Sequence, residues 1–236
     1  MTEHHSIVPH DAWTEARQKL LAKEKAFNRL RDELSAERRA LPWERVDKPY
    51  VFDGPDGRRS LAELFDGRSQ LVVYHFMLGP DWNEGCKSCS FWADNFNGID
   101  VHLAHRDVTF LAVSSAPLPR IEAFRQRMGW NFKWVSSAGS DFNHDYHVSF
   151  SPEELEKGDI YYNYTWRKSS LTELPGFSVF YKAADGAIYH TYSTYARGLD
   201  MMNGAYHVLD LVPKGRDEAN LGHAMSWVRL HDSYED

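Results

Sequence analysis

The chain has 236 residues, a formal net charge of −7 and a hydrophobic share of 42%. This composition provides for a packed core and argues against disorder along the whole length. The acidic balance argues against a nucleic-acid or membrane partner, because nucleic acids and anionic membranes attract clustered Lys and Arg. No apolar run approaches the roughly 18 residues of a membrane span, and no apolar signal segment follows Met1. The chain also has only two cysteines. For both reasons we expect a cytoplasmic protein in a reducing compartment.

A long amphipathic helix is predicted after a polar arm over residues 1–10. Asp11 is suited to be its N-cap, and Pro42 ends it. The apolar positions are spaced by threes and fours, with Lys23 in the one gap; they are Trp13, Ala16, Leu20, Phe27, Leu30 and Leu34. Two interpretations stay open: a helix packed on its own domain, or the seam of a homodimer, because a helix of this length outruns most single cores.

Strand and helix patterns alternate over residues 50–137. A short strand at 50–52 precedes a short helix at 61–65 that Ser60 can cap. The apolar run 71–77 lacks alternation, which is typical of a central strand covered on both faces. The expected elements that follow are a helix over 86–104 with Gly98 near its middle, a strand at 108–114, a helix through 128 opened by Pro117 or Pro119, and a strand at 133–137. This order predicts parallel crossover units.

Residues 138–172 give the least readable pattern, apart from a short helix capped by Ser151. A strand at 177–182, a turn containing Asp185-Gly186 and a returning strand at 187–192 then predict a β-hairpin. A helical segment follows at 201–211. The expected organisation is an arm and helix over 1–44, one α/β domain over 45–215, and a C-terminal extension over 216–236.

The two cysteines, Cys86 and Cys89, are spaced C-x-x-C between the apolar strand and the following helix. Positions i and i+3 are neighbours on a helix, and a helix N-terminus favours a thiolate. We therefore predict a redox dithiol, in which Cys86 attacks, Cys89 resolves, and Lys87 adds positive charge that lowers the pKa of Cys86. The alternatives are two structural cysteines, or part of a zinc site completed by a His pair such as His144 and His147.

A substrate groove is predicted around the cysteines. Pro175, just before the hairpin, is expected to form a cis peptide and to face the sulfurs, with an ordinary trans proline as the alternative. Trp82, in the loop before the cysteines, is expected to line the groove, whereas Phe91 and Trp92 are expected in the core. The acidic and histidine side chains of residues 141–147 could together hold a metal, but no established ligand spacing supports such a site. We expect no metal and no cofactor.

The chain resembles the bacterial family named domain of unknown function 899, whose members are described as predicted dithiol-disulfide oxidoreductases. The resemblance rests on Trp13, Ala16, Arg17, Leu20 and Leu21, on Leu41-Pro42-Trp43, on residues 85–92, and on Tyr195-Ala196-Arg197-Gly198-Leu199-Asp200. The order of elements resembles the thioredoxin fold. The resemblance implies an α/β thioredoxin-like fold, a central mixed sheet flanked by helices, with a long N-terminal helical extension.

The activity implied is thiol–disulfide exchange on a disulfide-containing protein or small molecule, with an external thiol reductant. Two rivals remain open. One is a non-catalytic thioredoxin-like binding or scaffold protein. The other is an atypical thiol peroxidase, although Asn83 stands where peroxiredoxins place a Thr or Ser three residues before the reactive cysteine.

Overall fold

The computed structural model describes residues 5–235, so residues 1–4 of the predicted arm and Asp236 lie outside the described residues. The chain divides into two compact units, Met1–Pro42 and Trp43–Asp236. The main element of the first unit is helix α1 (His10–Arg39). The predicted N-cap is wrong, because Pro9 takes that position in an extended conformation and Asp11 lies in the first turn. A carboxylate there still complements the helix dipole.

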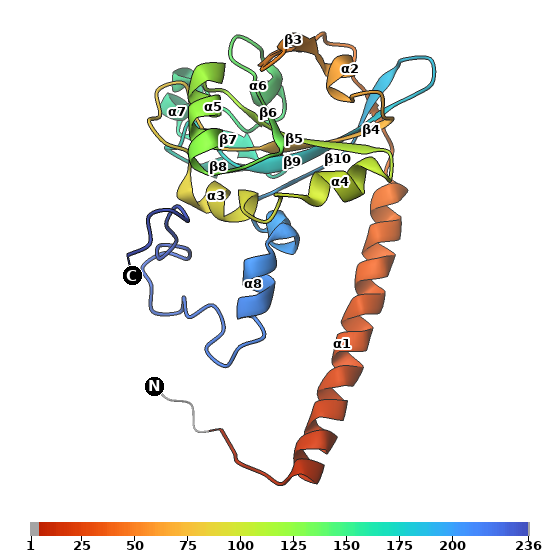
Figure 1. Cartoon of the computed structure of the whole chain (residues 1–236), viewed down its shortest axis with the longest axis vertical. Coiled ribbons are helices and arrows are strands. Elements are labelled where there is room, and N and C mark those ends of the chain that lie inside the picture. Colours follow the sequence, from red (N-terminus) through yellow and green to blue (C-terminus); the bar gives the residue numbers. More distant parts are fainter. Residues whose placement is uncertain (1–4, 236) are drawn as a thin grey trace. The chain divides into compact units, whose positions relative to one another are not determined.

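The second unit is built around a mixed β-sheet (Figure 1). Among the described residues, eight strands form it in the order β1-β10-β9-β4-β5-β6-β2-β3. Their bounds are β1 (Glu44–Arg45), β2 (Val51–Gly54), β3 (Gly57–Ser60), β4 (Gln70–His75), β5 (Val108–Ser114), β6 (Lys133–Ser136), β9 (Gly176–Lys182) and β10 (Ile188–Tyr195). Strands β4, β5 and β6 are parallel, whereas β9 pairs with β4 and β10 in the antiparallel sense. The predicted crossover units and hairpin are therefore confirmed.

Helices cover both faces of this sheet. The helices of this unit are α2 (Leu61–Leu64), α3 (Lys87–Ala93), α4 (Ile99–Ala104), α5 (Leu118–Arg127), α6 (Phe142–Asp145), α7 (Pro152–Lys157), the 3-10 helix η1 (Ala196–Met202) and α8 (Gly204–Leu209). Successive side chains of a strand point to opposite faces. Accordingly Tyr74 and Phe76 join a core with α3 and α5, whereas Leu71 and Val73 join a second core with α2 and α6. Figure 1 shows α3 and α4 on one side of the sheet and α2 on the other.

This architecture confirms the predicted thioredoxin-like α/β fold with a long N-terminal helix. The expected continuous helix over 86–104 is wrong, because the chain leaves α3 after Ala93 and begins α4 only at Ile99. Gly98 stands between them with a φ of 86°, a left-handed conformation that glycine adopts without steric cost. None of the helices within residues 5–235 is both long and apolar enough to cross a membrane.

Residues 138–172 contain a hairpin that the sequence did not predict. Strands β7 (Asp159–Tyr162) and β8 (Thr165–Lys168) pair with each other, outside the main sheet. The two residues of their turn, Asn163 and Tyr164, have φ values of 54° and 60°. A left-handed tyrosine is uncommon, so the turn carries none of the usual Asn-Gly or Asp-Gly signal.

Candidate functional site

The ends of three strands meet where the cysteines lie. His75, the last residue of β4, pairs with Val113 near the end of β5 and with Gly176 at the start of β9. From β4 the chain continues through a loop to Cys86, whose N–H donates a hydrogen bond of 3.0 Å to the carbonyl of Met77. This bond closes the loop and places Cys86 at the carboxyl edge of the parallel strands.

Gly85 allows the chain to enter α3 beside the core. A Cβ atom at this position would lie 2.5 Å from Cε1 of Phe124 and 2.7 Å from Cε1 of Phe76. Both rings are buried, so neither can easily move away. Glycine at this position therefore fixes where Cys86 begins the helix.

The two cysteines are free thiols in unlike surroundings. Cys86 is the N-cap of α3 and is half-buried, whereas Cys89 lies one turn into the helix and is only 2% exposed. The Cys86 sulfur accepts hydrogen bonds from the Cys89 thiol and from the N–H groups of Cys89 and Ser88. These bonds outweigh burial, which raises the pKa, and lower the pKa of Cys86 to about 7. Burial raises the pKa of Cys89 well above its ordinary value, and its hydrogen bond to Cys86 raises it further.

Tyr74 lies beneath the dithiol and was missed by the sequence reasoning. Its fully buried hydroxyl donates a hydrogen bond of 3.1 Å to the carbonyl of Cys89, and it also lowers the pKa of the Cys89 thiol. The available signal was a hydroxyl inside an apolar strand, because a buried tyrosine hydroxyl needs a partner. Tyr74 is thus positioned to influence the buried cysteine.

Pro175 lies at the same edge of the sheet, directly before Gly176. The expected cis peptide is wrong, since every peptide bond within residues 5–235 is trans. The trans form leads directly into β9 and leaves the Pro175 carbonyl to accept a hydrogen bond of 2.7 Å from the hydroxyl of Tyr162. Tyr162 in turn accepts a hydrogen bond of 2.9 Å from the N–H of Ala196. The buried Tyr162, from the unpredicted hairpin, therefore supports this edge.

The loop before the cysteines is closed by Trp82. Its half-buried ring packs against the core and over Gly79, where a Cβ would lie 2.9 Å from Nε1 of Trp82. Arg120 donates a hydrogen bond of 3.0 Å to the Trp82 carbonyl. A groove role for Trp82 and Pro175 stays a prediction.

Lys87 and the aromatic residues of α3 face the C-terminal part of the chain. The exposed Lys87 places Nζ 3.4 Å from the carbonyl of Ser226. Hydrogen bonds with Cys89 and Ser88 are what lower the pKa of Cys86. Trp92 is buried, as expected, and donates a hydrogen bond of 2.7 Å to the carbonyl of Leu199. Phe91 is partly buried against this same core.

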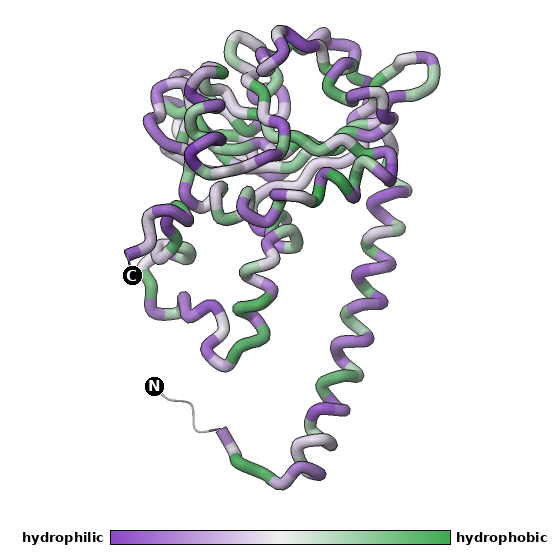
Figure 2. Tube along the Cα trace, in the orientation of Figure 1, coloured by the Kyte–Doolittle hydropathy of each residue, from purple (hydrophilic) through white to green (hydrophobic). Residues whose placement is uncertain are grey.

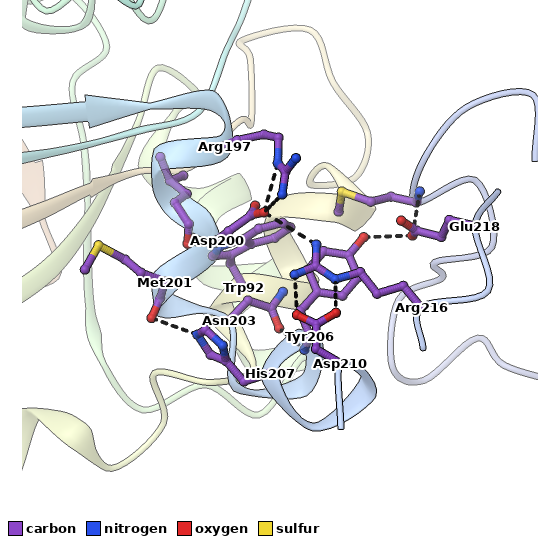
Figure 3. Close-up of polar contacts among 12 residues, drawn as sticks. Trp92, Arg197, Asp200, Met201, Asn203, Tyr206, His207, Asp210, Arg216 and Glu218 are labelled. Atoms are coloured by element: carbon purple, nitrogen blue, oxygen red, sulfur yellow. Dashed lines mark hydrogen bonds and ion pairs between the residues drawn. The ribbon is translucent and has the colours of Figure 1, made fainter. Parts of the chain in front are cut away.

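A polar network anchors the C-terminal part of the chain near α3 (Figure 3). The guanidinium of Arg216 lies 3.9 Å from the ring centroid of Tyr206 and forms a two-pronged ion pair with Asp210 at 2.7 and 2.8 Å. Glu218 accepts hydrogen bonds from the Tyr206 hydroxyl at 2.8 Å and from Nε1 of Trp227 at 2.7 Å. Because Tyr206 and Trp227 both contact the ring of Phe91, this network braces the dithiol helix.

The acidic side chains of residues 141–147 have other partners than a metal. Asp141 and Asp145 both pair with Nζ of Lys48, at 2.8 and 2.6 Å. Across residues 5–235, no group of three or more His, Cys, Asp and Glu side chains is arranged to hold a metal ion. The zinc alternative, with His144 and His147 completing the cysteine pair, therefore has no such ligand group within that range.

Comparison with known proteins gives a family but no activity. A family model described as "Bacterial protein of unknown function (DUF899)" matches residues 2–234. No curated protein matches the sequence.

Solved structures with a similar fold include the peroxidoxin BcpB of Mycobacterium tuberculosis, at 11% identity and a TM-score of 0.47, covering 71% of this chain and 97% of that one. Peroxiredoxin Q of Xanthomonas campestris is similar at 14% identity and a TM-score of 0.41, covering 71% and 96%. A secreted M. tuberculosis disulfide oxidoreductase homologous to E. coli DsbE is similar at 18% identity and a TM-score of 0.36, covering 66% and 92%. At these identities and TM-scores, the likenesses carry no conclusion about activity.

Proposed function

The chain belongs to the bacterial DUF899 family, and we propose that it is a thiol–disulfide oxidoreductase that works through Cys86 and Cys89. The observation that carries this proposal is the placement of the two thiols, with the half-buried Cys86 at the N-cap of α3 and the buried Cys89 one turn into the helix. The half-buried Cys86 has its pKa lowered to about 7, whereas the buried Cys89 has its pKa raised. A thiolate is the nucleophile in disulfide exchange, so the arrangement supplies one reactive sulfur and one protonated partner at neutral pH.

In the first step the Cys86 thiolate attacks one sulfur of a substrate disulfide. The substrate S–S bond breaks, one substrate thiolate leaves, and a mixed disulfide joins Cys86 to the other half of the substrate. Pro175, Trp82 and Lys87 are proposed to line the approach to Cys86. Their positions support this role, because Pro175 shares the sheet edge, and Trp82 and Lys87 flank Cys86 in the sequence.

In the second step Cys89 attacks Cys86 and releases the remaining substrate thiol. Once the mixed disulfide forms, Cys86 carries no charge, so two of the influences that raise the pKa of Cys89 disappear: its hydrogen bond to the Cys86 thiolate and the repulsion by that charge. The Tyr74 hydroxyl, which lowers that pKa, stays in place. Cys89 therefore gives up its proton to the departing thiolate more readily after the first step than before it.

The substrate gains two electrons as two thiols, and the protein ends with a Cys86–Cys89 disulfide. An external thiol reductant must restore the dithiol, and the electrons need no cofactor because they reside on sulfur. A reducing bacterial cytoplasm is the proposed location for this cycle.

The test uses the full chain with glutathione disulfide as substrate. We expect Cys89→Ser to accumulate a mixed disulfide on Cys86, seen as the mass of one glutathione, because the resolving thiol is missing. Cys86→Ser should acquire little glutathione in the same time, because Cys89 is buried. Equal labelling of the two variants, or no labelling of either, would contradict the assignment of roles.

A further inference from the structure

Helix α1 carries an apolar stripe along one face. The helix has 30 residues and none of them is buried. The stripe includes Trp13 at 56%, Leu20 at 51%, Phe27 at 64%, Leu30 at 52% and Leu34 at 42% exposure. Figure 2 shows hydrophobic and hydrophilic residues alternating along the helix. In water a helix gains most of its stability by packing such a face, so the stripe calls for a partner surface.

The spacing of the stripe is that of a coiled coil. Taking Trp13 as position a of a seven-residue repeat places Leu20, Phe27 and Leu34 at the following a positions. The d positions are then Ala16, Lys23, Leu30 and Glu37. Steps of three and four alternate over the whole helix, which keeps one seam facing a partner helix. We propose that α1 pairs with α1 of a second copy of this chain as a parallel two-stranded coiled coil.

Charges beside the seam identify the partner as a second copy. In a parallel, in-register pair, each g position meets the e position five residues further along the other helix. Lys19 then faces Glu24 of the other copy, and Glu33 faces Arg38. The remaining g positions, 12 and 26, are alanines, so no like charges meet between the g and e positions. Two-fold symmetry makes each attractive pair occur twice.

The same charges disfavour the antiparallel arrangement. In an antiparallel pair, Phe27 of one helix can pack against Leu30 of the other. The e positions of one helix then face the e positions of the other. Glu24 would then meet Arg31, but Arg17 would meet Arg38, and that pair repels. The charges at the e and g positions therefore fit the parallel register better, whereas the charges at the d positions, Lys23 and Glu37, oppose it.

The polar d positions set the strength of the pairing. In the parallel dimer Lys23 and Glu37 each meet their own copy at the seam, where like charges are unfavourable unless the long side chains reach the solvent. Polar residues at core positions lower the stability of a coiled coil. A reversible dimer, dependent on the charges beside the seam, is the expected result. This pairing does not depend on the proposed redox activity.

Charge-reversal variants of the full chain test the proposal. Lys19→Glu and Glu24→Lys each replace two attractive pairs between the helices with two repulsive ones, and each also removes an ion pair within the helix, Lys19–Glu15 or Arg17–Glu24. Each should raise the dimer dissociation constant about tenfold. An equimolar mixture of the two variants should regain dimers, because the carboxylate introduced at position 19 of one copy then faces the ammonium group introduced at position 24 of the other. The measurement is analytical ultracentrifugation over a range of concentrations, with circular dichroism to confirm that each variant is folded.

Matched controls carry the same charge changes on the outer face of α1. Lys25→Glu and Asp32→Lys lie at f positions, away from the seam, and should leave the dissociation constant unchanged. A monomeric wild-type protein at every concentration would overturn the proposal, as would dimers that the seam variants do not weaken. Failure of the mixture to regain dimers would overturn the parallel register.

Discussion

At the scale of single residues, hydrogen bonding at Cys86 and burial of Cys89 give the two thiols different reactivity. Because hydrogen bonding lowers the pKa of Cys86 to about 7, its thiolate fraction rises with pH and reaches one half near pH 7. We expect the rate of iodoacetamide alkylation at Cys86 to follow that curve, while buried Cys89 stays unmodified in the folded protein. Peptide mass spectrometry after timed quenching assigns the rates. A midpoint at or above about 8.5, the ordinary cysteine value, would contradict the account.

Tyr74 is predicted to position and tune Cys89. Removing its hydroxyl in Tyr74→Phe should cost about 1 kcal/mol of folding stability, and should slow the second step of exchange by leaving the pKa of Cys89 higher. Tyr195→Phe is the matched control, since its buried hydroxyl donates a bond of the same length, 3.1 Å, to the carbonyl of Tyr146. Single-turnover release of the second thiol is the readout. Equal release rates in the two variants would leave Tyr74 only a structural role.

The cysteine pair could be predicted from local sequence, but its supporting residues could not. The C-x-x-C spacing and its place after an apolar run are visible along the chain. That Tyr74 lies beneath Cys89, or that Tyr162 reaches Pro175, depends on how distant segments pack. The effect of Lys87 on the pKa of Cys86 stays a prediction, because the lowering comes from hydrogen bonds with Cys89 and Ser88.

At the scale of elements, the turn into α3 depends on Gly85. Replacing it with alanine brings a Cβ atom within 2.7 Å of both Phe76 and Phe124. We expect Gly85→Ala to cost about 1–3 kcal/mol of stability and to displace Cys86, which moves its alkylation midpoint upward. Gly222→Ala is the control, because no atom lies within 4 Å of a Cβ there. Chemical denaturation measures the cost, and unchanged stability and midpoint in Gly85→Ala would contradict this role.

The regular elements followed from periodicity, and the exceptions have local causes. Strand 108–114 and the capped helix after Ser60 agree with the sequence pattern, because apolar runs and capping boxes are local signals. The helix over 86–104 was wrong, since α3 ends at Ala93 and the left-handed Gly98 precedes the separate helix α4. The cis Pro175 was wrong, since its peptide bond is trans and Pro175 leads directly into β9.

At the scale of the whole molecule, Glu173 makes stability depend on pH. This carboxyl is 4% exposed and accepts hydrogen bonds from Ser115 and Ser149 at 2.6 and 2.7 Å. Burial raises its pKa from 4.5 to about 7, so the folded protein holds the proton more tightly than the unfolded chain does. The contribution of this protonated carboxyl to the free energy of unfolding is complete below about pH 4.5 and is lost as the pH rises through about 7.

Glu173→Gln removes this titration while keeping the shape of the side chain. A pKa difference of about 2.5 corresponds to about 3 kcal/mol, so the wild type should lose up to that amount relative to Glu173→Gln between pH 4.5 and pH 8. Urea denaturation of both proteins across this range gives the difference. Parallel stability curves for the two proteins would show that Glu173 is not held protonated.

If Cys86 and Cys89 form one reversible redox couple, titration in glutathione redox buffers will show it. At each ratio of reduced to oxidised glutathione, alkylation and intact mass report the two thiols together. We expect a single two-electron transition in which both cysteines become protected at once, with the same midpoint from the oxidised and the reduced side. If no internal disulfide forms at any ratio, or if glutathione stays attached to Cys86, the oxidoreductase proposal is contradicted.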